Sequence, residues 1–251
     1  MKNRQKNRQI FYTFLSYSFP ISFLFLSPII PFEGIFHEGK AGIVTGSLLV
    51  FAFLFIISIF LGRLYCGWIC PGGAFQETLC SYSNNKEVNS KFDKIKFVIW
   101  VPWLGGIIVS FFIVGGIKAI NFTFNTHFGS SFSIWGAYTI IYMIVAIIVV
   151  IISLLVGRRG FCHSTCWMAP FMILGKKTGS LMRLPHLTLK ADASKCINCK
   201  ICSKKCSMSL DVYSMVMQNK IDHSECILCG VCVDVCPKNV ISYTFKKPDS
   251  L

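Results

Sequence analysis

Two stretches near the C-terminal end decide the fold of this chain: CINCKICSKKC at residues 196–206 and CILCGVCVDVCP at residues 226–237. Each has the spacing C-x2-C-x2-C-x3-C. The first three cysteines of such a run lie on one tight loop and bind one [4Fe–4S] cluster, whereas the fourth ligates the other cluster. The spacing therefore predicts two [4Fe–4S] clusters. The predicted ligands of cluster 1 are Cys196, Cys199, Cys202 and Cys236, and those of cluster 2 are Cys226, Cys229, Cys232 and Cys206.

Zinc sites and disulfides are the alternatives for these eight cysteines. Zinc sites usually use two separated C-x2-C pairs, which would leave the third cysteine of each run without a role. Disulfides need an oxidising compartment, and the orientation argued below places these residues in a reducing one. Iron–sulfur clusters are therefore the favoured interpretation.

The composition is that of a membrane protein. Of 251 residues, 53% are hydrophobic and only 14% are charged, whereas soluble domains carry about 25% charged residues. The net charge of +14 comes from basic residues that flank apolar runs, which is a pattern typical of membrane topology. We therefore expect membrane lipid, and no nucleic acid, as a partner.

Four apolar runs of about 20 residues or more predict four transmembrane helices, at about residues 10–31, 43–62, 95–117 and 134–157. A helix of that length crosses roughly 30 Å of hydrocarbon. The first run follows a basic tail at residues 1–9, but it is too long for a signal peptide and lacks a small-residue cleavage site.

The distribution of Lys and Arg predicts the orientation of these spans. Residues 1–9, 63–96 and 158–190 contain fifteen basic residues in total, whereas the two remaining loops contain only Lys40 and Lys118. Basic residues concentrate on the cytoplasmic side. We therefore expect a multi-pass protein of the inner (cytoplasmic) membrane, with both termini and the cluster region in the cytoplasm.

An internal repeat follows the second and fourth spans. Residues 62–71 read GRLYCGWICP and residues 157–167 read GRRGFCHSTCW, so that Cys66 and Cys70 recur as Cys162 and Cys166 at an offset of 96. We call these two segments the Cys-x3-Cys corners. They predict two parallel helix-pair repeats, related by an axis near the membrane normal.

The four corner thiols are a candidate redox or metal site. On a continuous helix, cysteines at i and i+4 lie about 5–6 Å apart. Basic residues one turn away, Arg63, Arg158 and Arg159, would favour the thiolates. The pattern leaves open one four-thiolate site, two dithiols, a mixed site or a quinone site, with His163 as a further ligand candidate. Four small buried side chains at helix ends are the structural alternative.

The predicted fold is an all-α four-helix transmembrane domain at residues 10–175, followed by a basic linker at 176–190. A small α+β ferredoxin domain of the bacterial 2[4Fe–4S] type occupies residues 191–251, with strands expected around 210–216 and 241–245. The segments at 71–82 and 167–175 are too short to span a membrane and should lie at its interface. Glu77, in the first of them, should be a solvated carboxylate.

These motifs resemble those of the polyferredoxin-like, NapH-type family of membrane 4Fe–4S proteins. The resemblance rests on the corner at residues 66–71 and on the eight cluster cysteines, and it departs at the second corner, where Trp167 replaces proline. It implies an electron-transfer component of an oxidoreductase system, with electrons passing between cytoplasmic donors or the quinone pool and a membrane or extracytoplasmic redox partner.

Two further functions fit the same cysteines. Soft thiolates at the corners would suit a copper reductase or assembly factor that uses the clusters to reduce the metal. The other function is that of a redox-sensing maturation regulator, which binds a partner protein according to the redox state of its clusters.

Overall fold

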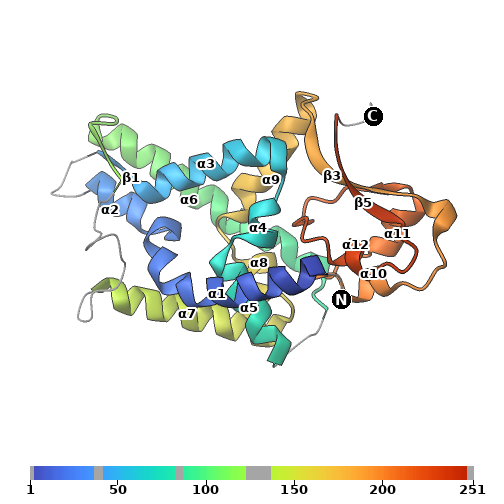
Figure 1. Cartoon of the computed structure of the whole chain (residues 1–251). Helices are drawn as coiled ribbons and strands as arrows, with labels where there is room; N and C mark the ends of the chain where they lie inside the picture. Colours follow the sequence, from blue (N-terminus) through green and yellow to red (C-terminus); the bar gives the residue numbers. More distant parts are fainter. Residues whose placement is uncertain (1–2, 37–41, 83–86, 123–136, 248–251) are drawn as a thin grey trace.

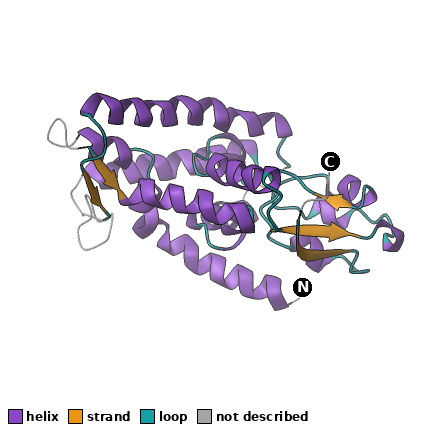
Figure 2. Cartoon of the chain, turned by 90° about the horizontal axis from the view of Figure 1, so that it is seen from above, coloured by secondary structure: helices purple, strands orange, loops and turns teal. Residues whose placement is uncertain are grey.

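The structure is a computed structural model that describes residues 3–36, 42–82, 87–122 and 137–247. It divides into a helical half and a smaller α+β half at one end of it (Figure 1). Figure 2 shows the same division, with the long helices in one half and the three-stranded sheet in the other. We call the smaller half the cluster domain, because it contains both cysteine runs.

The helical half is built from four long helices that run alongside one another (Figure 1). They are α1 (Asn3–Leu26), α3 (Gly46–Leu61), α6 (Ile95–Val114), which follows the 3-10 helix η2 (Ser90–Lys94), and α7 (Ala137–Val156). Among the described residues, one stretch, Ser90–Val114, is long and apolar enough to cross a membrane, and the apolar helices at Gly46–Leu61 and Met143–Val156 are shorter.

The boundaries of the predicted spans differ from the observed elements. The predicted span 10–31 is covered by α1, which already begins in the basic tail, and by the start of a separate helix, α2 (Ile30–Phe36). The predicted span 43–62 begins with the strand β1 (Ile43–Thr45), which pairs in parallel with β2 (Ala119–Asn121). Three residues are too few to show a periodicity that separates a strand from a helix.

The internal repeat is visible in the short helices at the corners. Helix α4 (Leu64–Trp68) and helix α8 (Gly160–Ser164) have equal length and lie 96 positions apart. Helices α5 (Pro71–Tyr82) and α9 (Ala169–Leu181) follow them. Each packs against a long helix of the other repeat, α5 on α7 and α9 on α3.

Small residues allow α9 to lie close against α3. A Cβ atom on Gly175 would overlap the Oγ of Ser58, and one on Gly179 would meet the carbonyl oxygen of Ile59. Close backbone approach through small residues is the usual way in which apolar helices pack in membrane proteins. The contact holds the second corner beside the end of α3, where the first corner begins.

The cluster domain has a small antiparallel sheet in the order β4-β3-β5. The strands are β3 (His186–Ala191), β4 (Lys220–Ile221) and β5 (Ile241–Lys246). In the register, Leu189 of β3 faces Ile221 on one side and Tyr243 on the other. The 3-10 helix η3 (Ala193–Lys195) follows β3, and α10 (Ile201–Lys204) and α12 (Val231–Val235) follow the two triple-cysteine loops.

The strand predicted around 241–245 is confirmed by β5, but the strand predicted around 210–216 is wrong. That segment forms helix α11 (Val212–Met217), and the carboxylate of Asp211 caps it by accepting a hydrogen bond of 3.2 Å from the backbone N–H of Ser214. Val212 and Val216 are buried one turn apart on the face toward the sheet. Capping and the helical spacing outweigh the β preference of valine.

Candidate metal centres

The two triple-cysteine loops have the same backbone conformation. In each loop the residues two and four positions after the first cysteine have left-handed φ angles: 58° at Asn198 and 54° at Lys200, then 52° at Leu228 and 74° at Gly230. Left-handed residues alternating with ordinary ones turn successive N–H groups toward one side, which makes a concave site for an anionic group. Non-glycine residues in this region are strained. The two cysteine runs therefore share their backbone geometry as well as their spacing.

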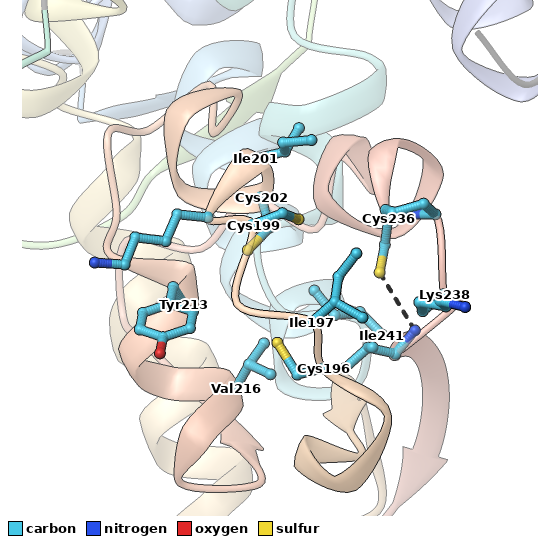
Figure 3. A pocket seen from close by; sticks show the side chains of 13 residues that line it. Cys196, Ile197, Cys199, Ile201, Cys202, Tyr213, Val216, Cys236, Lys238 and Ile241 are labelled. Carbon is cyan, nitrogen blue, oxygen red and sulfur yellow. Dashed lines mark hydrogen bonds between the residues drawn. The ribbon is translucent and has the colours of Figure 1, made fainter.

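Each of two cavities is lined by three cysteines of one run and the fourth cysteine of the other. We call them cavity 1 and cavity 2; they enclose about 380 and about 400 Å³ of empty space. Figure 3 shows the side chains around cavity 1. Cavity 1 is lined by Cys196, Cys199, Cys202 and Cys236, and cavity 2 by Cys206, Cys226, Cys229 and Cys232. These are the predicted ligand sets, so the fold brings each set around one space.

The arrangement fits a cubane rather than a single ion. Among the described residues, no three His, Cys, Asp or Glu side chains converge on one point that a metal ion could occupy. The thiolates of a [4Fe–4S] cluster bind different irons at the corners of the cube, so they need a space between them. The backbone N–H of Val240 also donates to the Sγ of Cys236 at 3.4 Å, which is the kind of contact that tunes such a cluster.

The two cavities differ in their exposure. Cys199 in the lining of cavity 1 is exposed, and the neighbouring Ile197 is 55% exposed. In cavity 2, Cys229 and Cys232 are buried. Burial also raises the pKa of Cys206 in cavity 2, to about 12. Cavity 1 therefore lies at the surface, whereas cavity 2 lies inside the molecule.

The structure also brings the two Cys-x3-Cys corners together. All four corner cysteines are buried. Cys70, Cys162 and Cys166 line one cavity of about 450 Å³, the corner cavity, together with aromatic side chains. Cys66 lies beside it, with its Sγ 3.9 Å from the Sδ of Met172.

The corner cysteines are not on continuous helices, as the i and i+4 argument assumed. Helix α4 ends before Cys70, whose N–H bonds to the carbonyl of Tyr65 five residues earlier, and helix α8 ends before Cys166 in the same way, on the carbonyl of Phe161. The second thiol of each pair is therefore carried by the turn that ends the helix.

Gln76 is a residue of the corner cavity that sequence reasoning missed. Its side-chain N–H donates to the Sγ of Cys162 at 3.2 Å, and its side-chain oxygen accepts from the N–H of Cys162 at 3.3 Å. A hydrogen bond from Cys166, with support from Arg159, lowers the pKa of Cys162 to about 5 although burial opposes it, while the pKa of Cys166 is raised. The only sequence signal for Gln76 was a polar residue in an apolar segment.

The three arginines predicted to favour thiolates have different positions. Arg159 is buried and donates to the carbonyl of Cys66 at 2.9 Å. Arg63 is also buried and pairs with Glu225 of the cluster domain at 2.6 Å. Arg158 lies away from the corner thiols, because it donates to the backbone carbonyls of Lys204 and Cys206.

The prediction that Glu77 is a solvated carboxylate is wrong. Its side chain is 22% exposed, and it pairs with Arg8 at 2.8 Å and with Arg159 at 3.2 Å. Burial raises the pKa of Glu77, but the two arginines outweigh it and hold the pKa below its usual value. Tyr12 completes the group by accepting from Arg159 and donating to the carbonyl of Cys66.

His163 does not line the corner cavity. Its Nδ1 contacts the carboxylate of Asp93 in η2, and its Nε2 is buried without a partner among the described residues. His163 is therefore next to Cys162 in the sequence, but its side chain does not line the corner cavity.

The buried charges around the corner do not balance. Glu77 is shared by two buried arginines, Arg8 and Arg159, and Glu225 is shared by Arg63 and Lys96. Among the described residues, these four buried cations are ion-paired with only two carboxylates, and the carboxylate of Asp93, which contacts His163, is a third negative group near Lys96. The Nε of Arg63 also has no partner among the described residues. Buried charge is stable only when compensated, so thiolates or a thiolate-bound centre suit this site.

The loop of cavity 2 lies directly against the first corner. A Cβ atom on Gly67 would overlap the carbonyl oxygen of Ile227 and come within 3.2 Å of the Cα of Cys229. The indole N–H of Trp68 donates to the carbonyl of Leu228 at 3.1 Å. The residue after Cys66 is therefore in contact with the backbone that carries a cluster-2 cysteine.

Comparison with known families agrees with these sites. The sequence profile of a family described as "4Fe-4S binding domain" matches residues 43–86 and 138–177, which contain the two corners. The profile of a "4Fe-4S dicluster domain" matches residues 195–241. No solved structure matches the chain.

Several proteins are similar to most of the chain. An uncharacterized protein of Methanocaldococcus jannaschii is 27% identical over 80% of this chain and 83% of its own length. The methylamine utilization ferredoxin-type protein MauN of Methylorubrum extorquens is 29% identical over 65% of this chain and 53% of its own. The putative electron transport protein YccM of Escherichia coli is 23% identical over 74% and 55%.

The chain spans a little more than half the length of MauN and YccM. The resemblance to the NapH-type, polyferredoxin-like proteins is nevertheless confirmed, because the chain matches both kinds of 4Fe–4S domain and is distantly similar to the ferredoxin-type proteins MauN and YccM. The chain is therefore a ferredoxin-type iron–sulfur electron transport protein that binds [4Fe–4S] clusters and is a distant homologue of MauN and YccM.

Proposed function

We propose that this protein passes electrons between a donor at the cytoplasmic face, or the quinone pool, and a redox partner in or beyond the membrane. In this proposal the four apolar helices span the inner membrane, both termini lie in the cytoplasm, and the Cys-x3-Cys corners lie at the cytoplasmic edge of the bilayer. The cysteines around cavities 1 and 2 ligate clusters 1 and 2.

The single observation that carries the proposal is the contact between Gly67 and the loop of cavity 2. Gly67 follows Cys66 and touches the backbone of Cys229, a proposed ligand of cluster 2. This contact supports a path that runs from cavity 1 at the surface through cavity 2 to the corner. A bound [4Fe–4S] cluster takes up and releases one electron at a time at a potential set by its surroundings.

The chain's own residues give this path an exposed end and a buried end. The exposed Cys199 gives a soluble partner access to cluster 1. Buried residues exclude water from cluster 2, and the cations Arg63 and Lys96 on Glu225 lie between the two halves. Positive charge near a cluster favours its reduced form. Lys200 and Lys238, which line cavity 1, favour the reduced form of cluster 1 in the same way. We therefore expect both clusters to accept electrons and to pass them between the surface and the corner.

Electron flow into a bilayer tests the proposal. Protein reconstituted in sealed vesicles with a menaquinone analogue should reduce it when titanium(III) citrate, which does not cross the bilayer, is added outside. Cys232→Ser removes a proposed ligand of cluster 2 and should stop this flow while cluster 1 remains reducible. Cys80→Ser is the matched control, because Cys80 belongs to neither ligand set. Unchanged flow in Cys232→Ser would contradict the proposal.

A second candidate function is reduction or delivery of a soft metal ion at the corner. The corner cavity is lined by three thiols and Met168, and Met172 touches Cys66. Thiolates and thioethers select soft ions such as Cu(I). A variant that lacks all eight cluster cysteines distinguishes the two: copper retained in it favours this candidate, and no bound metal disfavours it.

A further inference from the structure

A cavity without cysteines lies on the cluster domain. It holds about 790 Å³ of empty space, more than any of the three cysteine-lined cavities. Residues of β3, of β4 and of the end of β5 line it, and four of them are lysines: Lys190, Lys220, Lys246 and Lys247. We call it the basic cleft.

The positive charge of the basic cleft is not compensated from within. Asp222 is the only acidic residue in its lining, and this carboxylate is bound to Lys176 at 2.6 Å. Among the described residues, Lys190, Lys220 and Lys247 make no ion pair. Lysines gathered around one hollow repel each other, so an anion bound there is stabilised by all of them.

One strand of the basic cleft starts beside the helical half. Its strand β3 begins at His186, directly after α9, and the carbonyl of Leu187 lies 3.9 Å from the Cβ position of Gly62 at the end of α3. The last residue of α9 and the first residue of the turn that leads to β3 are exposed apolar side chains, Leu181 at 84% and Met182 at 62%. Figure 1 shows this turn at the border between the two halves.

Exposed apolar side chains and a basic cleft are the two components of a site for a lipid at the membrane interface. Apolar residues enter the boundary of the acyl region. Lysines attract anionic headgroups, and each lysine near the surface raises the affinity about fivefold. Phosphate oxygens accept charge-assisted hydrogen bonds from several ammonium groups at once.

We propose that the basic cleft binds the phosphate of an anionic phospholipid, while Leu181 and Met182 enter the acyl region of the same leaflet. The site anchors the cluster domain against the membrane surface, so that cavity 2 stays on the corner. The inference rests on the proposed membrane position, but it requires no electron flow.

Short-chain lipids test the proposal on the full-length protein in detergent. Dioctanoyl phosphatidylglycerol should bind saturably, and dioctanoyl phosphatidylcholine should bind at least tenfold more weakly. The triple variant Lys190→Gln, Lys220→Gln, Lys247→Gln should weaken phosphatidylglycerol binding roughly a hundredfold. The control triple variant Lys91→Gln, Lys204→Gln, Lys205→Gln removes the same charge from exposed positions outside the cleft and should bind as the wild type.

The arms of the experiment separate the possible sources of phosphate. Binding of inorganic phosphate as tight as that of phosphatidylglycerol would assign the cleft to a soluble anion and overturn the lipid proposal. Equal weakening in both triple variants would also overturn it, because the effect would then be general charge. Iron content and circular dichroism of each variant show that the fold is retained. A protein that stays monodisperse without detergent refutes the membrane position, whatever its electron flow.

Discussion

At the scale of single residues, Gly67 decides how closely the helical half approaches a cluster. Gly67→Ala should push the loop of Ile227 and Cys229 away. The new Cβ would overlap a backbone carbonyl, which cannot move aside unless the backbone itself shifts. We expect a loss of roughly 1–3 kcal/mol in the free energy of unfolding and slower electron transfer from cluster 2. Thermal unfolding and stopped-flow reduction would measure the two effects.

Gly105 provides the matched control for this substitution. It lies inside α6, and a Cβ atom there would meet nothing within 4 Å. Gly105→Ala should therefore be neutral, or stabilising by roughly 0.5–1 kcal/mol through helix propensity. Equal losses in the two variants would show that the close contact at Gly67 has no special role.

Glu77 should be necessary for stability near neutral pH. Glu77→Gln leaves Arg8 and Arg159 without their shared carboxylate, which should cost roughly 2–4 kcal/mol. Because the arginines lower the pKa of Glu77, its contribution is complete above the unfolded value of about 4.3 and is lost as the pH falls through the lower, folded pKa. The difference in Tm between wild type and variant should shrink in that acidic range, and a constant difference would contradict this.

The residues that the sequence predicts and those that it does not predict differ in how far along the chain their partners lie. The eight cluster cysteines follow a local spacing, so their grouping around cavities 1 and 2 could be predicted from the sequence. Gln76 and Glu77 act on partners 69 to 86 positions away. Such pairing depends on how helices pack, and single-sequence patterns contain no information about it. Glu77 was therefore assigned to solvent.

At the scale of elements, α1 has a role that its basic sequence did not indicate. The sequence predicts a tail that sets topology, but Arg4 pairs with Asp234 at 2.9 Å and Gln5 donates to the carbonyl of Cys229 at 3.0 Å. Helix α1 thus fixes the loop of cavity 2 to the helical half. Charge patterning predicts where a basic residue lies relative to a membrane, and does not predict its partner.

The double variant Arg4→Ala, Gln5→Ala tests this role of α1. The variant loses the bonds of both side chains to Asp234 and their hydrogen bonds to the carbonyls of Gly230 and Cys229. This loss should cost roughly 2–3 kcal/mol, and cluster 2 should become more sensitive to oxygen while cluster 1 is unchanged. Electron paramagnetic resonance after timed air exposure would separate the two clusters. Lys6→Ala is the control, since Lys6 is exposed on the same helix. Parallel loss of both clusters would contradict a local role.

The elements that were predicted wrongly are short. The long apolar helices could be expected from composition, although α1 and α2 divide one predicted span. The segment at 212–217 became helix α11 because Asp211 caps it, and the ends of α4 and α8 before Cys70 and Cys166 depend on turn geometry. Over five or six residues, caps and packing outweigh periodicity.

At the scale of the whole molecule, exposure should determine the order in which iron is lost. Two [4Fe–4S] clusters contain about eight irons. Cavity 1 has the exposed Cys199, whereas Cys229 and Cys232 of cavity 2 are buried against the corner. We expect an iron chelator to remove about half of the iron in a fast phase and the rest slowly, measured by absorbance and iron assay. A single phase would show that both clusters open together.

The position of the two chain ends argues that both lie on the same side of the bilayer in the proposed membrane arrangement. The start of α1 contacts the cluster domain through Arg4 and Gln5, and the end of β5 belongs to the same domain, whereas the pair β1–β2 lies at the far end of the helical half (Figure 1). If the helices span a bilayer, green fluorescent protein fused at either terminus should therefore fluoresce in the cytoplasm. Alkaline phosphatase fused after Gly116, before β2, should be active, because the enzyme works only outside the cytoplasm. An inactive fusion at Gly116, or a dark terminus in an expressed protein, would contradict the proposed topology, because the contacts of α1 leave no arrangement in which the termini lie on opposite faces.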